Sequence, residues 1–124
     1  MSDRVSVDER IHPGHAITSP SSEYTLIFQE DSNLVLYRNN DDGQEAIWAS
    51  NTMHGEDESS ENKSLILQGD GNFVLYGAEG ETLWASGSGY EGVGSPFVVV
   101  QDDGNVCLYD DEVEGRHWET GTAQ

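Results

Sequence analysis

A nine-residue pattern that recurs three times constrains the fold of this chain more than any other feature of its sequence. The copies occupy residues 29–37, 68–76 and 101–109, and each begins with Gln-x-Asp-x-Asn and ends with Leu-Tyr. An apolar run precedes every copy, and a tryptophan follows it. Such repetition is typical of an architecture in which similar subunits share one core.

The repeated units are predicted to be β-strands. They are short, rich in Val, Leu, Phe and Tyr, and bounded by Gly, Asn, Asp and Ser. The Asp-x-Asn triplet inside each copy has the chemistry of a turn, which predicts a hairpin followed by a strand that carries the tryptophan. No stretch shows the apolar spacing of a helix. Because each small sheet is too thin to be stable alone, we expect one all-β domain over residues 1–124, packed around Trp48, Trp84 and Trp118.

The connecting segments differ in character. The first 20 residues contain Val5, Ile11 and Ile17 and are predicted to add edge strands to the sheet of the third copy. Residues 51–62 are acidic without an apolar pattern, which predicts a surface loop. The glycine-rich residues 87–94 are predicted to form a flexible connector.

The polar residues of the motif form a candidate ligand site. Side chains alternate across a strand, and we therefore expect the odd positions of each copy to share one face while Leu34 and Leu36 point to the core. The shared row of amide, carboxylate and phenol groups both donates and accepts hydrogen bonds, as does a sugar hydroxyl. The candidate carbohydrate-binding residues are Gln29, Asp31, Asn33, Val35 and Tyr37; Gln68, Asp70, Asn72, Val74 and Tyr76; and Gln101, Asp103, Asn105, Cys107 and Tyr109.

Other interpretations of this row are possible. A single copy would fit a solvated strand face, but a solvated face does not require the same residues in the same order three times. A purely structural polar ladder would explain the repetition as well. No catalytic residues are predicted, because the three aspartates have equivalent settings, and the four histidines lack metal-ligand spacing. We expect no metal and no cofactor.

The charge balance excludes several classes of partner. The chain has 24 acidic side chains against 5 Lys and Arg, a formal net charge of −19. Such a surface repels nucleic acid and anionic membranes. It suits a protein working at high salt, although a soluble acidic surface selected against aggregation explains it equally well. The N-terminus lacks the apolar segment of a signal peptide, and no apolar run approaches a membrane span. A cytoplasmic location and non-classical release both remain open.

The motif Gln-x-Asp-x-Asn-x-Val-x-Tyr, three times with trailing tryptophans, resembles the bulb-type mannose-binding lectins, which include the snowdrop agglutinin. The resemblance implies a β-prism of three four-stranded antiparallel sheets with pseudo-threefold symmetry. It also implies calcium-independent binding of mannose, with Asp and Asn on the axial O2, Gln on O3, Tyr on O4 and Val against the ring. Cys107 stands where the family has valine, and the third copy is therefore expected to be the weakest.

The resemblance further implies a multivalent lectin whose partners are mannose-containing glycans, and a homodimer formed through the C-terminal strand at residues 116–122. Two other functions remain open from the sequence. One is a targeting module of an antibacterial protein, and the other is a β-prism scaffold or protein-interaction module whose sugar sites are relics.

Overall fold

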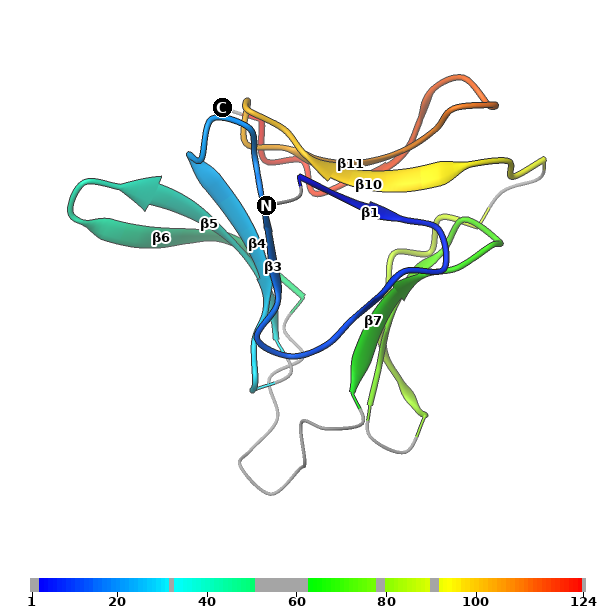
Figure 1. Ribbon diagram of the computed structural model, residues 1–124, viewed down its shortest axis with the longest axis horizontal. Coiled ribbons are helices and arrows are strands. Elements are labelled where there is room, and N and C mark those ends of the chain that lie inside the picture. Colours follow the sequence, from blue (N-terminus) through cyan, green and yellow to red (C-terminus); the bar gives the residue numbers. More distant parts are fainter. Residues whose placement is uncertain (1–2, 32, 51–62, 78–79, 90–91, 124) are drawn as a thin grey trace.

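Three small sheets make up the described structure. The computed structural model describes residues 3–31, 33–50, 63–77, 80–89 and 92–123, and within them the chain forms twelve β-strands in three four-stranded sheets. Every pairing between these strands is antiparallel. Figure 1 shows the sheets as the three sides of a triangle. The predicted all-β architecture of three four-stranded antiparallel sheets is confirmed.

Each sheet contains one copy of the motif, and we number the sheets by that copy. The first sheet has the order β3 (Ala16–Thr18), β4 (Tyr24–Phe28), β5 (Leu34–Asn40) and β6 (Gly43–Ala49). The second has β2 (Arg10–Ile11), β7 (Ser64–Leu67), β8 (Phe73–Tyr76) and β9 (Thr82–Ala85). The third has β1 (Arg4–Ser6), β10 (Pro96–Val100), β11 (Val106–Asp110) and β12 (Arg116–Glu119). The three motif copies therefore occupy equivalent positions, each in the hairpin formed by the second and third strands of its sheet.

The N-terminal segment corrects one prediction. Its three short strands do not all join the third sheet: β1 pairs with β10, β2 with β7, and β3 with β4. Asp8 (φ 66°) and Gly14 (φ 95°) adopt left-handed backbone conformations in the segments between these strands, where the chain changes direction. Each hairpin unit supplies three strands, and the N-terminal segment passes all three sheets and adds the fourth strand to each (Figure 1).

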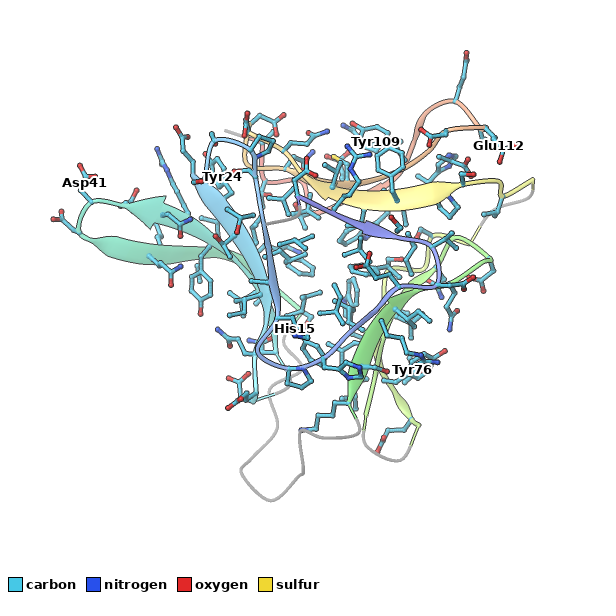
Figure 2. The ribbon with its side chains drawn as sticks, in the orientation of Figure 1. His15, Tyr24, Asp41, Tyr76, Tyr109 and Glu112 are labelled. Atoms are coloured by element: carbon cyan, nitrogen blue, oxygen red, sulfur yellow. The ribbon has the colours of Figure 1, made fainter. Side chains whose placement is uncertain are left out.

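The core lies between the three sheets. Each edge strand contributes one buried residue, namely Val5, Ile11 or Ile17, and the residue before each motif tyrosine is fully buried. Figure 2 shows side chains filling the space inside the triangle of sheets. The tryptophans meet one another as expected, but they lie beside the buried core and do not form its centre. Trp48, Trp84 and Trp118 pack edge to face, with ring centroids 5.6–5.9 Å apart, and remain half-buried against the core.

Two connecting segments carry predictions from the sequence. The predicted surface loop at residues 51–62 lies outside the described residues. The described start of the segment at residues 87–94 is tied down, because the backbone N–H groups of Gly87 and Ser88 donate to Asn72 Oδ1 at 2.9 and 3.4 Å. A freely flexible connector is therefore wrong for its first residues. No helix in the described part of the chain is long and apolar enough to cross a membrane.

Candidate functional site

The polar half of each motif is a turn rather than a strand. β4 ends at Phe28 and β5 begins at Leu34, so that Gln29–Asn33 connects them, and the other two copies follow the same plan. In the second copy, Gln68 N donates to Asn72 O at 2.9 Å, and Gly71 N donates to Gln68 O at 3.0 Å. The prediction that period-two alternation aligns the whole polar row is therefore wrong for its first half. A hydrogen-bonded turn brings these groups together instead.

The aspartate of each copy shapes this turn. Its Oδ1 atom accepts a hydrogen bond from the backbone N–H of the motif asparagine, at 2.9 Å for Asp31, Asp70 and Asp103 alike. A side-chain oxygen that binds the backbone two residues later forms an Asx turn. This bond fixes the direction of the carboxylate and leaves its second oxygen for other partners.

The two ends of each motif meet across the turn. Gln29 Nε2 donates to the Tyr37 hydroxyl at 2.5 Å, Gln68 donates in the same way to Tyr76, and Gln101 donates to Tyr109 at 3.0 Å. Tyr76 and Tyr109, labelled in Figure 2, lie on different sheets. All six of these residues are half-buried. The structure thus brings together the first and last polar residues that the sequence singled out in every copy.

The apolar position of the motif lies on the side of the sheet away from the core. Val35, Val74 and Cys107 are at most 4% exposed, yet none belongs to the central core cluster that contains their neighbours Leu36, Leu75 and Leu108. The valine is therefore the floor of the site, covered by surrounding side chains, and offers a ligand only a small apolar area.

The motif asparagine is held by a residue that sequence reasoning did not assign. Two positions after each tryptophan, a hydroxyl side chain donates to the asparagine Oδ1: Ser50 to Asn33 at 3.2 Å, Ser86 to Asn72 at 3.1 Å, and Thr120 to Asn105 at 3.1 Å. The same hydroxyl accepts the backbone N–H at the start of the motif strand. Because the amide oxygen accepts these hydrogen bonds, the side-chain amide of each asparagine is held in one orientation.

The third copy differs in its surroundings. Asn105 is only 2% exposed, whereas Asn33 and Asn72 are half-buried. Glu119 occupies the position of Ala49 and Ala85 in the other sheets, and its Oε1 accepts a hydrogen bond from Asn105 Nδ2 at 3.0 Å. Burial raises the pKa of the Cys107 thiol, while the nearby Tyr109 hydroxyl and Arg116 partly offset this rise.

The groups of the site have the hydrogen-bonding chemistry that a neutral polar ligand requires. Among the described residues, no cluster of three or more His, Cys, Asp or Glu side chains is arranged to hold a metal ion. Each motif copy presents an amide carbonyl and a carboxylate oxygen from its turn, and a phenolic hydroxyl from the strand that follows, above an apolar floor. Such a set can donate to and accept from vicinal hydroxyl groups at once.

Comparison with known proteins finds similar sequences and structures among lectins. No protein-family model matches the chain. A mannose-specific lectin from Aloe arborescens is 33% identical over 105 residues, which cover 82% of each protein. A monomeric mannose-binding lectin from Gastrodia elata has a TM-score of 0.82 at 33% identity, over 99% of this chain and 100% of that chain. The mannose-specific agglutinin of snowdrop (Galanthus nivalis), solved with methyl α-D-mannoside, has a TM-score of 0.72 at 32% identity over 99% of both chains.

The fold and its three repeated turns define a β-prism of the lectin type, a class of binding proteins rather than of enzymes. Within that class, the chain belongs to the bulb-type mannose-binding lectin family, represented by the snowdrop agglutinin.

Proposed function

We propose that this protein is a calcium-independent lectin that binds mannose and α-mannosides through the repeated motif. The observation that carries the proposal is the Gln–Tyr hydrogen bond above a buried valine, formed in the same way in the first two copies. That bond uses the amide N–H and the phenolic oxygen, and leaves the Gln carbonyl and the Tyr O–H for a ligand.

The remaining polar groups suit one face of a hexose. Asp31 and Asp70 each use one carboxylate oxygen within the turn, and Asn33 and Asn72 each use their amide oxygen. In our proposal the second carboxylate oxygen and the amide nitrogen bind the axial O2 of mannose, while Gln binds O3 and Tyr binds O4. Val35 and Val74 lie under the ring carbons. The axial O2 contact favours mannose over glucose.

Binding at one site should be weak. The site lies in a partly exposed turn, and the valine floor offers little apolar area, so we expect a dissociation constant on the order of millimolar, or about −4 kcal/mol. Useful strength would come from several sites on one chain binding one branched glycan, because the second contact is then intramolecular.

Association of two chains would further increase the strength of binding to a branched glycan. We propose a homodimer formed through the C-terminal strand. β12 pairs with β11 of its own chain and is an edge strand of the third sheet. Exchange of β12 between two copies would keep the same β11–β12 hydrogen bonds, which makes the exchange inexpensive. Sedimentation velocity tests this step: a dimer that is lost on deletion of residues 116–124 supports it, and a monomer at millimolar protein contradicts it.

The sugar specificity is tested by titration calorimetry in the presence of EDTA. Methyl α-mannoside should bind, methyl α-glucoside should bind at least several-fold more weakly, and EDTA should change neither result. Loss of mannoside binding on adding EDTA would contradict the metal-free mechanism. Heat from both sugars alike would contradict the role of the axial hydroxyl.

A further inference from the structure

The amide of the third copy is satisfied at both ends by the protein itself. Asn105 Oδ1 accepts hydrogen bonds from Thr120 Oγ1 at 3.1 Å, from Gly121 N at 3.0 Å and from Thr122 N at 3.2 Å. Its Nδ2 donates to Glu119 Oε1 at 3.0 Å. The equivalent Asn72 has the same oxygen contacts, but its nitrogen makes no hydrogen bond within the described residues.

The cause is one substitution beside the motif. In each sheet, the residue after the tryptophan pairs with the apolar floor of the site: Ala49 with Val35, Ala85 with Val74, and Glu119 with Cys107. An alanine methyl group is too short to reach the amide nitrogen and cannot accept a hydrogen bond. The glutamate side chain reaches it and accepts.

A second contact fixes the glutamate in place. Arg116 Nη2 lies 2.6 Å from Glu119 Oε2, so that one carboxylate oxygen binds the guanidinium and the other binds the amide. The counterpart of Arg116 in the second sheet is Thr82, because each pairs with the motif tyrosine of its own sheet. The pair of Arg116 and Glu119 is therefore a feature of the third sheet that the second sheet lacks.

We propose that Glu119 is the specificity-determining residue of the third copy, acting as an internal ligand that closes it to neutral mannosides. This inference rests on the proposed function. A sugar hydroxyl would have to displace a carboxylate from the amide nitrogen, and a hydrogen bond to a charged group is roughly twice as strong as one between neutral groups. The displaced carboxylate would gain only water in return. The chain is thus bivalent, with working sites at the first and second copies.

The inference is tested by following each site separately. In a ¹⁵N-labelled protein, the side-chain NH₂ signals of Asn33, Asn72 and Asn105 report the three copies during titration with methyl α-mannoside. In the natural protein we expect the first two signals to shift along saturable curves while that of Asn105 stays still. In Glu119→Ala, the Asn105 signal should shift as well, with an affinity at least about tenfold above that in the natural protein, equivalent to about 1.4 kcal/mol.

A reciprocal variant protects the test against a folding defect at the third site. Thr82→Arg combined with Ala85→Glu transplants the pair into the second sheet and should silence the Asn72 signal while Asn33 still responds. Thr82→Arg alone is the matched control and should leave Asn72 responsive.

Three outcomes would overturn the inference. The Asn105 signal would shift in the natural protein with the affinity of the other two, or it would shift only after Cys107→Val is added to Glu119→Ala, or the transplanted pair would leave Asn72 responsive. In each of these, Asn33 still responds and the proposed function stands. Silence of all three signals with every mannoside would contradict the proposed function and this inference together.

Discussion

Among single residues, the recurring feature is an asparagine whose amide oxygen accepts a hydrogen bond from a hydroxyl side chain directly after the next strand. Ser86 donates to Asn72 Oδ1 at 3.1 Å and accepts from Phe73 N at 3.0 Å, so one side chain joins the turn, the start of the motif strand and the segment that follows β9. The sequence repeats this hydroxyl residue two positions after every tryptophan. Its partner could not be predicted, because that requires the register between β8 and β9.

Removing this hydroxyl should weaken both folding and the site. Ser86→Ala leaves the Phe73 N–H without its acceptor and removes one of the donors to Asn72 Oδ1, and we expect the free energy of unfolding to fall by about 1–3 kcal/mol. Urea denaturation measures the change. Thr82→Ala, at the exposed start of β9, the strand that ends just before Ser86, is the control and should lie within about 0.5 kcal/mol of the natural protein. Equal effects of the two substitutions would contradict this role of the Ser86 hydroxyl.

Cys107 provides a pH-dependent prediction. Burial raises its pKa in the folded protein, whereas the thiol of the unfolded chain has a pKa of about 8.5. Above that pH the folded protein holds more protons than the unfolded chain, so stability is fully present below it and declines as pH rises toward the folded pKa. The natural protein should therefore lose stability relative to Cys107→Val as the pH rises from about 8 to about 10. A difference that stays constant over this range would contradict the raised pKa.

Among the structural elements, the hairpin turn is the unit that builds the site. The sequence predicts hairpins at the Asp-x-Asn triplets, and these are confirmed, but alternation alone also assigns the polar half of the motif to a strand. A continuous strand and a turn both place Gln29 and Tyr37 on the same side of the sheet. The local sequence pattern therefore could not distinguish a strand from a turn. The N-terminal strands pose a similar problem. The sheet that each N-terminal strand joins is determined by the packing of all three sheets, and the sequence of residues 3–20 alone does not specify it.

The turn of the second copy can be tested at a glycine. Gly71 has φ 86°, a left-handed conformation that strains any residue with a Cβ, and we expect Gly71→Ala to lower the free energy of unfolding by about 1–2 kcal/mol. Gly69 lies in the same turn without such a φ, and a Cβ added to it would meet only open space. Thermal unfolding of Gly69→Ala should match the natural protein, and a loss as large as that of Gly71→Ala would contradict the role of the turn.

In the molecule as a whole, the apolar core stabilises the fold, whereas the surface charge opposes it. The three sheets share one apolar core, while the chain has a net charge of −19 and most of its described carboxylates are exposed, where they repel one another. Screening by salt removes repulsion beyond about 3 Å at 1 M. We therefore propose a protein suited to high ionic strength and expect the melting temperature to rise with NaCl. Calorimetry from about 0.1 M to about 2 M salt measures this, and a flat dependence would contradict it.

Binding of mannose by the two complete motif copies underlies every other functional proposal. Retention on immobilised α-mannan measures it, in a comparison of the natural protein with Asp31→Ala/Asp70→Ala. Asp41→Ala/Asp42→Ala is the matched control, since it removes the same two charges from the exposed connection between β5 and β6. With melting temperatures checked for all three proteins, we predict that the motif variant loses retention on mannan while the control is retained. Retention of a folded motif variant at the level of the natural protein would contradict mannose binding through these motifs.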